Sequence, residues 1–401
     1  MRDQIWTRDF TAWVIANTFI VINFYLLMPT MAGYAMDRFG APESMAGLAA
    51  GLFVIGAVFV RLIAGKYLDL IGRRKMLRLG AALFFLASVA YWQIQSLAIL
   101  YLIRFLHGVA FGLVSNALMT IAVSALPARR RGEGTGYLTL STAAASAIGP
   151  SLALALISRS YDWLFAACAA VSFLAAVTIL PGKVEELKLA EEERQKMKTG
   201  WRFSDLVDAR SLPLSLVLLA FAVLYTSILA FLNTYAEEKR WLEEAYLFFP
   251  VYAVMLFVSR PLAGRLMDRK GENVVLYPAF ILYAVCFLML AWAPSGWVMV
   301  AAAAPLAFGF GIFFPAFQSI IARMTPPHRL GLALSTCMVC LDAGTGVGGY
   351  VVGFVAERVG FENTYLLMAA MVAALIPVYH FVHGRKAQKP HKTQSSVSQN
   401  A

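Results

Sequence analysis

The sequence predicts an all-α membrane protein whose twelve transmembrane helices form two pseudo-symmetric six-helix bundles. Its 401 residues are 60% hydrophobic and only 14% charged, whereas soluble domains are closer to half apolar and a quarter charged. Apolar runs recur that are long enough to cross a hydrocarbon core of about 30 Å. The second half of the chain also repeats the charged, glycine and proline pattern of the first. Together these observations exclude a soluble enzyme, a disordered protein and a disulfide-stabilised secreted domain.

Twelve apolar runs define the expected spans. We expect helices because lipid offers no hydrogen-bond partner to the backbone, so each span must satisfy its own backbone groups. The runs lie near residues 10–35, 44–68, 76–94, 97–124, 135–158, 161–180, 212–236, 243–267, 274–293, 297–322, 331–356 and 362–383.

Polar segments between these runs predict the domain boundaries. We expect an N-terminal bundle over residues 1–180 and a C-terminal bundle over residues 212–383. The longest polar interval, residues 181–211, is expected to be a cytoplasmic linker between them. Residues 384–401 are polar and are expected to form a disordered cytoplasmic tail.

The distribution of basic residues predicts the orientation. Of the 34 Lys and Arg residues, 26 fall in the termini and loops of one side, and five fall in the loops of the other. Because cytoplasmic loops carry the excess of Lys and Arg, both termini are expected in the cytoplasm and the protein in the inner (plasma) membrane. The net charge of +11 therefore indicates membrane topology and argues against a nucleic-acid partner. The four cysteines lie inside apolar runs, and neither a metal site nor a cofactor is expected.

The internal repeat has an offset of 199 residues and runs without a gap. Two homologous bundles imply a pseudo-two-fold axis along the membrane normal, with a cavity between the halves near the midplane. The aligned pairs are Arg61 and Arg260, Gly65 and Gly264, Asp69 and Asp268, Gly72 and Gly271, Gly112 and Gly311, Pro127 and Pro326, Arg130 and Arg329, Gly132 and Gly331, and Gly149 and Gly348.

A G-x-x-x-D-x-x-G pattern ends the second span and recurs at the end of the eighth. Gly65 and Asp69 share a helix face, so a neighbouring helix can approach closely, and Gly72 and Arg73 follow at the helix end. The second copy consists of Gly264, Asp268, Arg269 and Gly271.

On these two loops the chain resembles the major facilitator superfamily, and the resemblance covers all twelve spans. It implies that Asp69 pairs with Arg73 and with the start of the eleventh helix, closing a cytoplasmic gate. Leu70 replaces a residue that is usually basic. Glu272 stands where the second copy often has an arginine, so only part of that copy is expected to act.

The fourth span carries Arg104, Gly108, Gly112 and Asn116 at four-residue intervals, with His107 beside them. The arrangement resembles a motif of the family that is linked with proton coupling. Arg104 is accordingly a candidate for coupling, and its alternative is a structural arginine bonded to helix carbonyls. His107 is a candidate proton group or, alternatively, a satisfied interior histidine.

Gly149 and Pro150 in the fifth span resemble a motif of the family's exporters, although Ala145 departs from it. Gly149 is expected to allow close contact with the other half. In the eleventh span, Asp342 is an acid deep in an apolar run, where charges are costly and usually functional. It is the first candidate for the coupling proton; alternatively, it caps a local kink or pairs with a cavity arginine such as Arg61 or Arg260.

Arg61 and Arg260 are expected to line the substrate cavity, together with Asn23 and Asn116. The two arginines suit an anionic or carboxylate-bearing substrate, but they suit equally bonds to the gate carboxylates or to backbone carbonyls.

We therefore expect a secondary transporter that exports an amphipathic, drug-like or metallophore-like small molecule by proton antiport. The alternative is a proton-coupled uptake symporter. A membrane enzyme is disfavoured because no catalytic constellation is present, and a channel because repeated gate loops suit alternating access. The expected partners are the small-molecule substrate, protons and the lipid bilayer, and the protein is expected to be a monomer.

Overall fold

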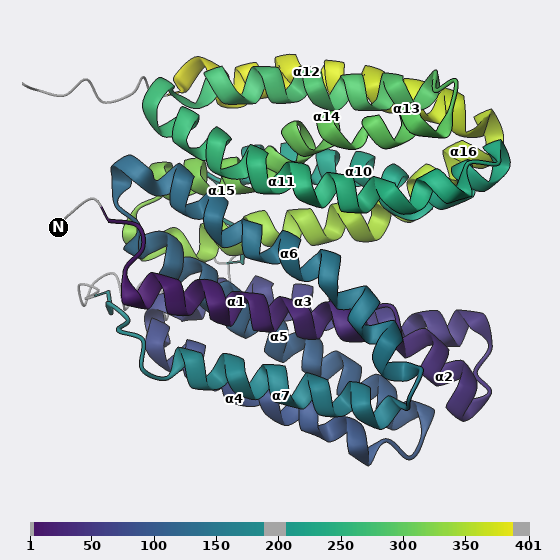
Figure 1. Ribbon diagram of the computed structural model, residues 1–401. Helices are drawn as coiled ribbons and strands as arrows, with labels where there is room; N and C mark the ends of the chain where they lie inside the picture. The colour runs from purple at the N-terminus through teal and green to yellow at the C-terminus, as the bar shows by residue number, and fades with distance from the viewer. Residues whose placement is uncertain (1–3, 188–205, 388–401) are drawn as a thin grey trace, which may run out of the picture.

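The computed structural model describes residues 4–187 and 206–387. Within these ranges every regular element is a helix, which confirms the predicted all-α fold. Figure 1 shows two bundles side by side, the first built from α1–α7 and the second from α10–α16. Residues 188–205 of the expected linker and residues 388–401 of the expected tail lie outside the described residues.

The N-terminal bundle begins with a break that the sequence did not predict, because its first span consists of two helices separated by a turn. Side-chain oxygens cap two of the helices: Thr7 accepts from the amide of Phe10 at 3.2 Å, and Ser96 from that of Ile99 at 3.3 Å. The helices are α1 (Arg8–Leu27), α2 (Met31–Phe39), α3 (Glu43–Ile71), α4 (Arg73–Val89), α5 (Leu97–Ala125), α6 (Arg131–Ile157) and α7 (Tyr161–Ile179).

The C-terminal bundle contains the same number of spans and the same number of helices, but its spans are divided differently. Its tenth span is divided into α13, α14 and α15, whereas its last two spans form one 53-residue element that bends at Gly360, where φ is 77°. The helices are α10 (Leu212–Lys239), α11 (Leu242–Lys270), α12 (Glu272–Ala291), α13 (Gly296–Ala301), α14 (Ala303–Phe308), α15 (Phe310–Met324) and α16 (Leu330–Val382).

Eleven segments of the described chain are long and apolar enough to cross a membrane. The twelfth span is α3, whose 29 residues include the apolar stretch Gly51–Gly65. The expected architecture of twelve spans is therefore present.

One end of the molecule gathers the basic loops, and we call it the basic end. The N-terminal segment and several interhelical loops lie there, on the left in Figure 1. The opposite end is called the far end below. The basic end comprises the loops that carry Arg73–Arg78, Arg129–Arg131, Arg269, Lys270 and Arg329.

Two glycines terminate the long helices at the basic end. Gly72 separates α3 from α4 with φ of 112°, and Gly271 separates α11 from α12 with φ of 97°. Side chains disfavour this backbone region, so glycine is needed at both positions. The repeated loop pattern therefore has a direct backbone cause.

The two bundles touch through two equivalent helix pairs, α3 with α16 and α6 with α11. A Cβ atom on Gly65 would lie 2.9 Å from the Cβ of Ser335, and one on Gly264 would lie 2.8 Å from the Cα of Glu133. The missing side chains thus let the backbones approach at the same place in both repeats, as the spacing predicts.

Candidate functional site

An ion pair joins the two halves near the middle of their spans. Arg61 of α3 contacts the Asp342 carboxylate of α16. Arg61 is 4% exposed, and its second guanidinium nitrogen donates to Ser115 Oγ at 3.1 Å. The guanidinium also lies 5.5 Å from the centre of the Phe111 ring, a favourable cation–π distance. Arg61 is therefore neutralised and bonded through both terminal nitrogens, whereas its Nε atom has no hydrogen-bond partner in the described chain.

Asp342 is more accessible than its partner, since 24% of its side chain is exposed. On its basic side, Ser335 Oγ donates to the carbonyl of Arg61, and Leu332 packs against Gly65. These contacts join α3 and α16 between Asp342 and the basic end.

Arg260 of α11 occupies the place of Arg61 in the second repeat, but its environment differs. Its Nε donates to the carbonyl of Gly311 at 3.1 Å, and Nη1 donates to the carbonyl of Thr139. No carboxylate pairs with it among the residues that the structure describes. Its charge therefore rests on carbonyl dipoles and on nearby hydroxyl groups.

Three tyrosines surround Arg260 and interact with it electrostatically: Tyr25 of α1, Tyr225 of α10 and Tyr252 of α11. The rings of Tyr225 and Tyr252 lie 6.3 Å apart. Tyr225 also stacks on Phe310 at 4.1 Å, with planes only 8° apart. One tyrosine comes from the first half and two from the second, so the group spans the interface.

The first gate loop forms the pair that the resemblance implies between Asp69 and Arg73, at 2.6 Å. The Asp69 side chain is 1% exposed, and its Oδ2 atom has no hydrogen-bond partner in the described part of the chain. Arg73 reaches the start of the eleventh span, donating to the carbonyl of Pro327 at 3.1 Å, and Asp69 interacts electrostatically with His328 there. The first gate therefore crosses the interface through both residues.

The second gate loop joins the two halves through its aspartate. Asp268 accepts from the amides of Gly132 at 3.0 Å and Glu133 at 2.9 Å, capping the start of α6 in the other half. It also pairs with Arg323 of α15. The expected Arg269 is exposed instead and makes no pair within the described residues.

Arg323 is a site residue that sequence reasoning missed. It aligns with Ser124 at the 199-residue offset, just as Glu272 aligns with Arg73. The arginine lost from the loop is thus replaced from the end of a neighbouring helix, and Arg323 lies 3.6 Å from Glu272. Glu272 in turn contacts His383 at 2.5 Å. Both replacements, Glu272 for Arg73 and Arg323 for Ser124, are visible in the alignment of the two repeats.

Arg104 and His107 lie inside the N-terminal bundle, away from the interface pair. Arg104 donates to the carbonyl of Ala49 at 2.7 Å and lies 4.7 Å from the centre of the Phe53 ring. Both ring nitrogens of His107 have partners: Tyr91 Oη lies at 3.1 Å and Ser88 Oγ at 3.3 Å. These contacts correspond to the structural alternative for both residues.

The two asparagines of the expected cavity differ in environment. Asn23 is fully buried and donates to Ser88 Oγ at 3.1 Å and to the carbonyl of Cys168 at 2.8 Å, so it joins helices of one bundle. Asn116 is also fully buried, but neither polar atom of its side chain has a partner in the described chain. Gln318 of α15, which the sequence did not single out, has the same property.

The nearest neighbour of Gly149 lies in its own half. A Cβ atom there would collide with Tyr25 of α1, in the same half and not in the other. Sequence spacing shows that a glycine permits close packing but not which helix approaches. Pro150 follows within α6, which continues to Ile157.

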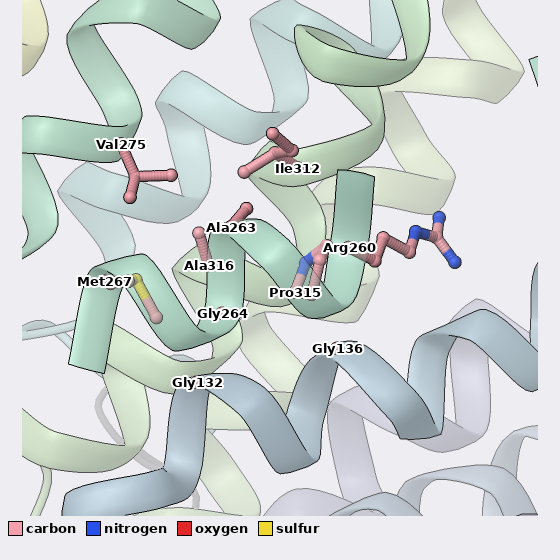
Figure 2. Close-up of a pocket in the computed structure, with 10 residues that line it drawn as sticks. All are labelled: Gly132, Gly136, Arg260, Ala263, Gly264, Met267, Val275, Ile312, Pro315 and Ala316. Atoms are coloured by element: carbon pink, nitrogen blue, oxygen red, sulfur yellow. The ribbon is translucent and has the colours of Figure 1, made fainter. Parts of the chain in front are cut away.

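A small pocket near the basic end is not a substrate site by its chemistry. It lies between α6, α11, α12 and α15, and apart from Arg260 only apolar or glycine positions line it. Figure 2 shows the Arg260 side chain extending away from the other lining residues. The pocket is the residual space where Gly132, Gly136 and Gly264 meet. In the described residues no cluster of His, Cys, Asp and Glu could hold a metal ion.

Comparisons with known proteins agree with this architecture. A model of the Major Facilitator Superfamily matches residues 13–303 and 275–399. An MFS-type transporter of Burkholderia mallei is 26% identical over 388 residues, covering 94% of this chain and 92% of the relative.

Two solved structures share the fold. A bacterial homologue of the iron transporter ferroportin, in an outward-facing state, has a TM-score of 0.74 at 18% identity, covering 94% of this chain and all of that one. The proton:xylose symporter XylE has a TM-score of 0.73 at 14% identity, covering 94% of this chain and 95% of that one.

Proposed function

This chain belongs to the major facilitator superfamily, and from that premise we propose that it is a proton-coupled exporter of an amphipathic small molecule. Secondary transport follows from the family. The proposal adds the direction, the coupling ion and the substrate class. The single observation that carries it is the ion pair between Arg61 and Asp342, which joins the halves and leaves 24% of the acid side chain exposed.

Asp342 is the proton carrier in this proposal. As a carboxylate it pairs with Arg61 and holds α16 against α3. A proton that arrives from the far end neutralises it and removes the attraction to Arg61. The halves then separate at the basic end, because the pair is one of the bonds between them. Protonation therefore favours the conformation that opens the basic end, and deprotonation favours the one that closes it.

Export follows from this coupling when the basic end faces the cytoplasm, as the excess of Lys and Arg predicts. The proton is taken up outside and released inside, while the substrate binds inside and leaves outside. The driving force is about 2.3 kcal/mol per 100 mV for each charge moved, with about 1.4 kcal/mol added per pH unit. The proton-motive force is sufficient without a nucleotide.

The gate residues act as a second set of bonds that must break in each cycle. Arg73, oriented by Asp69, bonds to the carbonyl of Pro327, and Asp268 bonds to the start of α6; these bonds hold the basic end shut in the outward-open conformation. Gly65, Gly72, Gly264 and Gly271 give these bonds their close helix contacts and loop geometry. Arg104 serves as a positioning residue in this scheme, since it fastens α5 to α3.

Export is favoured over uptake by Gly149 and Pro150. Gly149 brings α6 against Tyr25, one of the tyrosines near Arg260, so the exporter-like motif lies beside the candidate cavity. The alternative is an uptake symporter, in which substrate and proton travel together. The two functions predict opposite directions of substrate movement under the same proton gradient.

The proposal is tested in everted membrane vesicles from cells that overproduce the protein. An acidic interior is generated, and a fluorescent pH probe reports proton escape when dyes, antibiotics or metallophores are added. An exported compound is expected to release protons from wild-type vesicles. Asp342→Asn is expected to abolish this release, and Asp162→Asn, an exposed acid of α7, is expected to retain it.

An Asp342→Asn protein that still builds an uncoupler-sensitive substrate gradient contradicts the assignment of the proton. Substrate that moves out of the everted vesicles together with protons shows uptake symport in the cell and contradicts export.

A further inference from the structure

We propose that Arg260, Tyr25, Tyr225 and Tyr252 bind the anionic group of the substrate, which is an organic anion with an aromatic body. This inference names the substrate class and rests on the proposed function for its physiological meaning. It depends on an asymmetry between the two repeats that can be tested by binding alone.

The two repeats match in register around their arginines. Ser335 bonds to the carbonyl of Arg61, and at the 199-residue offset its counterpart Gly136 lies against the carbonyl of Arg260. A Cβ atom on Gly136 would be 3.0 Å from that carbonyl oxygen. The counterpart of Asp342 is therefore Ala143, which is 4% exposed. The second repeat has the arginine but lacks the acid.

This difference leaves one positive charge in the space between the halves without a counter-ion. An arginine within a membrane span is costly unless it is paired or reaches water. The Nη2 atom of Arg260 has no hydrogen-bond partner in the described chain and is not among the buried unpaired atoms. It is therefore accessible to a ligand atom. A carboxylate, sulfonate or phosphate group fits this guanidinium, because charge-assisted bonds to oxyanions are the strongest that arginine makes.

The tyrosines supply the rest of the site. Their neutral hydroxyl groups can donate hydrogen bonds to an anion. Their rings offer apolar surface to the aromatic body of the substrate. Tyr225 is held flat against Phe310, so one face of the site is fixed before any ligand arrives. Because Tyr25 belongs to the other half, a bound anion contacts both bundles. Binding is then sensitive to their relative position, as alternating access requires.

A neutral or cationic substrate fits this site less well. Either substrate leaves the positive charge of Arg260 without a counter-ion. A cation is in addition repelled by that charge. The acid of the cavity offers no alternative cation site while it is paired with Arg61.

The test compares 2-naphthoate and 2-naphthalenesulfonate with the neutral 2-naphthamide, which has nearly the same size. Equilibrium binding is measured with the purified full-length protein in lipid nanodiscs, without a proton gradient. Wild type is expected to bind both anions at least about tenfold more tightly than the amide, as one charge-assisted hydrogen bond of roughly 1.5–3 kcal/mol implies. Equal affinity for anion and amide, or no binding of either anion, overturns the proposal.

Ala143→Asp places an acid opposite Arg260, and Ala143→Asn is its matched control of similar volume. The aspartate is expected to remove the preference for anions, whereas the asparagine is expected to keep it, and the affinity for the amide is expected to be the same in both. A preference that survives in a monodisperse Ala143→Asp protein overturns the proposal. Arg260→Gln is expected to behave like Ala143→Asp.

Tyr252→Phe removes only one hydroxyl group. It tests the anion site if neither polar side chain is tolerated at position 143. Its affinity for naphthoate is expected to fall about threefold while that for the amide is unchanged, and unchanged affinity for both overturns the site. These outcomes are separate from the proposed function. Anion binding without proton-driven flux would contradict the proposed coupling mechanism but not the anion site. Proton-driven flux without a preference for anions would contradict the anion site but not the coupling mechanism.

Discussion

At the scale of single residues, the buried gate carboxylates of the two repeats are paired with arginines from different parts of the chain. Asp69 is paired with Arg73 from its own loop, whereas Asp268 is paired with Arg323 from α15. The alignment of the repeats predicts Glu272 in the place of Arg73, but it does not say which residue compensates. That depends on which helix end lies beside the loop, and only the packed structure shows it.

Arg323→Gln tests this exchange of charge. Asp268 is 6% exposed in its side chain, so losing the arginine leaves a nearly buried carboxylate with only the two amides of α6. We expect the free energy of unfolding to fall by about 1–3 kcal/mol, measured as a lower unfolding temperature in detergent. Arg269→Gln, at the exposed loop arginine, serves as the control and is expected to leave the temperature unchanged. Equal effects of both substitutions would contradict the assignment of Arg323 to the gate.

The pair of Arg61 and Asp342 illustrates what sequence can supply at this scale. Both residues stood out because charges inside apolar runs are rare, and a pair with Arg61 was one of two readings of Asp342. Spacing along one chain does not determine contacts between helices nearly three hundred residues apart. For the same reason Asn23, polar and inside a span, was expected in the cavity but is bonded within its own bundle.

At the scale of elements, most helices are where the hydropathy predicts them, and the exceptions have local causes. The predicted span at residues 297–322 is three helices, with breaks at Ala302 and Gly309. A Cβ atom on Gly309 would lie 2.7 Å from the backbone nitrogen of Tyr283, so the break allows α12 to approach. Hydropathy averages over such breaks, because the residues on either side remain apolar.

Gly264→Val tests the importance of the close contact between α11 and α6. An added side chain meets the carbonyl of Gly132 at 2.6 Å, and backbone rather than a flexible side chain must give way. We expect a loss of about 1–3 kcal/mol in stability and a longer distance between spin labels at Lys75 and Lys270, one in each half at the basic end.

The matched control is Gly346→Ala in α16, where nothing lies within 4 Å of the added atom. Because alanine favours a helix over glycine by up to about 1 kcal/mol, the substitution is expected to keep or slightly raise the stability and to leave the spin-label distance unchanged. A Gly264→Val protein with the wild-type distance would show that this contact does not hold the basic end closed.

At the scale of the whole molecule, the bonds between the halves are unevenly distributed. Those described above lie at the level of Arg61 and Arg260 or on the basic side of it, and Figure 1 shows the bundles meeting at that end. The sequence predicted two bundles and a cavity between them from the repeat. It did not predict which end is closed, because one sequence encodes every conformation of the transport cycle.

The orientation of the molecule is tested by labelling single cysteines in a cysteine-free background. Cysteines at Arg74 and Lys270 are expected to resist an impermeant maleimide in intact cells, because both positions belong to basic loops assigned to the cytoplasm. A cysteine at Ser96, between α4 and α5, is expected to react. Labelling at Arg74 and Lys270 from outside, with protection at Ser96, would reverse the topology and with it the direction of proton movement.

The central claim is that a proton on Asp342 releases Arg61 and opens the basic end. The most direct measurement is the distance between the spin labels at Lys75 and Lys270 as a function of pH, in nanodiscs without substrate. Lowering the pH is expected to shift the wild-type population from a short to a long distance, since protonation removes one bond of the closed conformation. Asp342→Asn is expected to show the long distance at every pH. A short distance in Asp342→Asn, with the same pH response as wild type, would contradict the account.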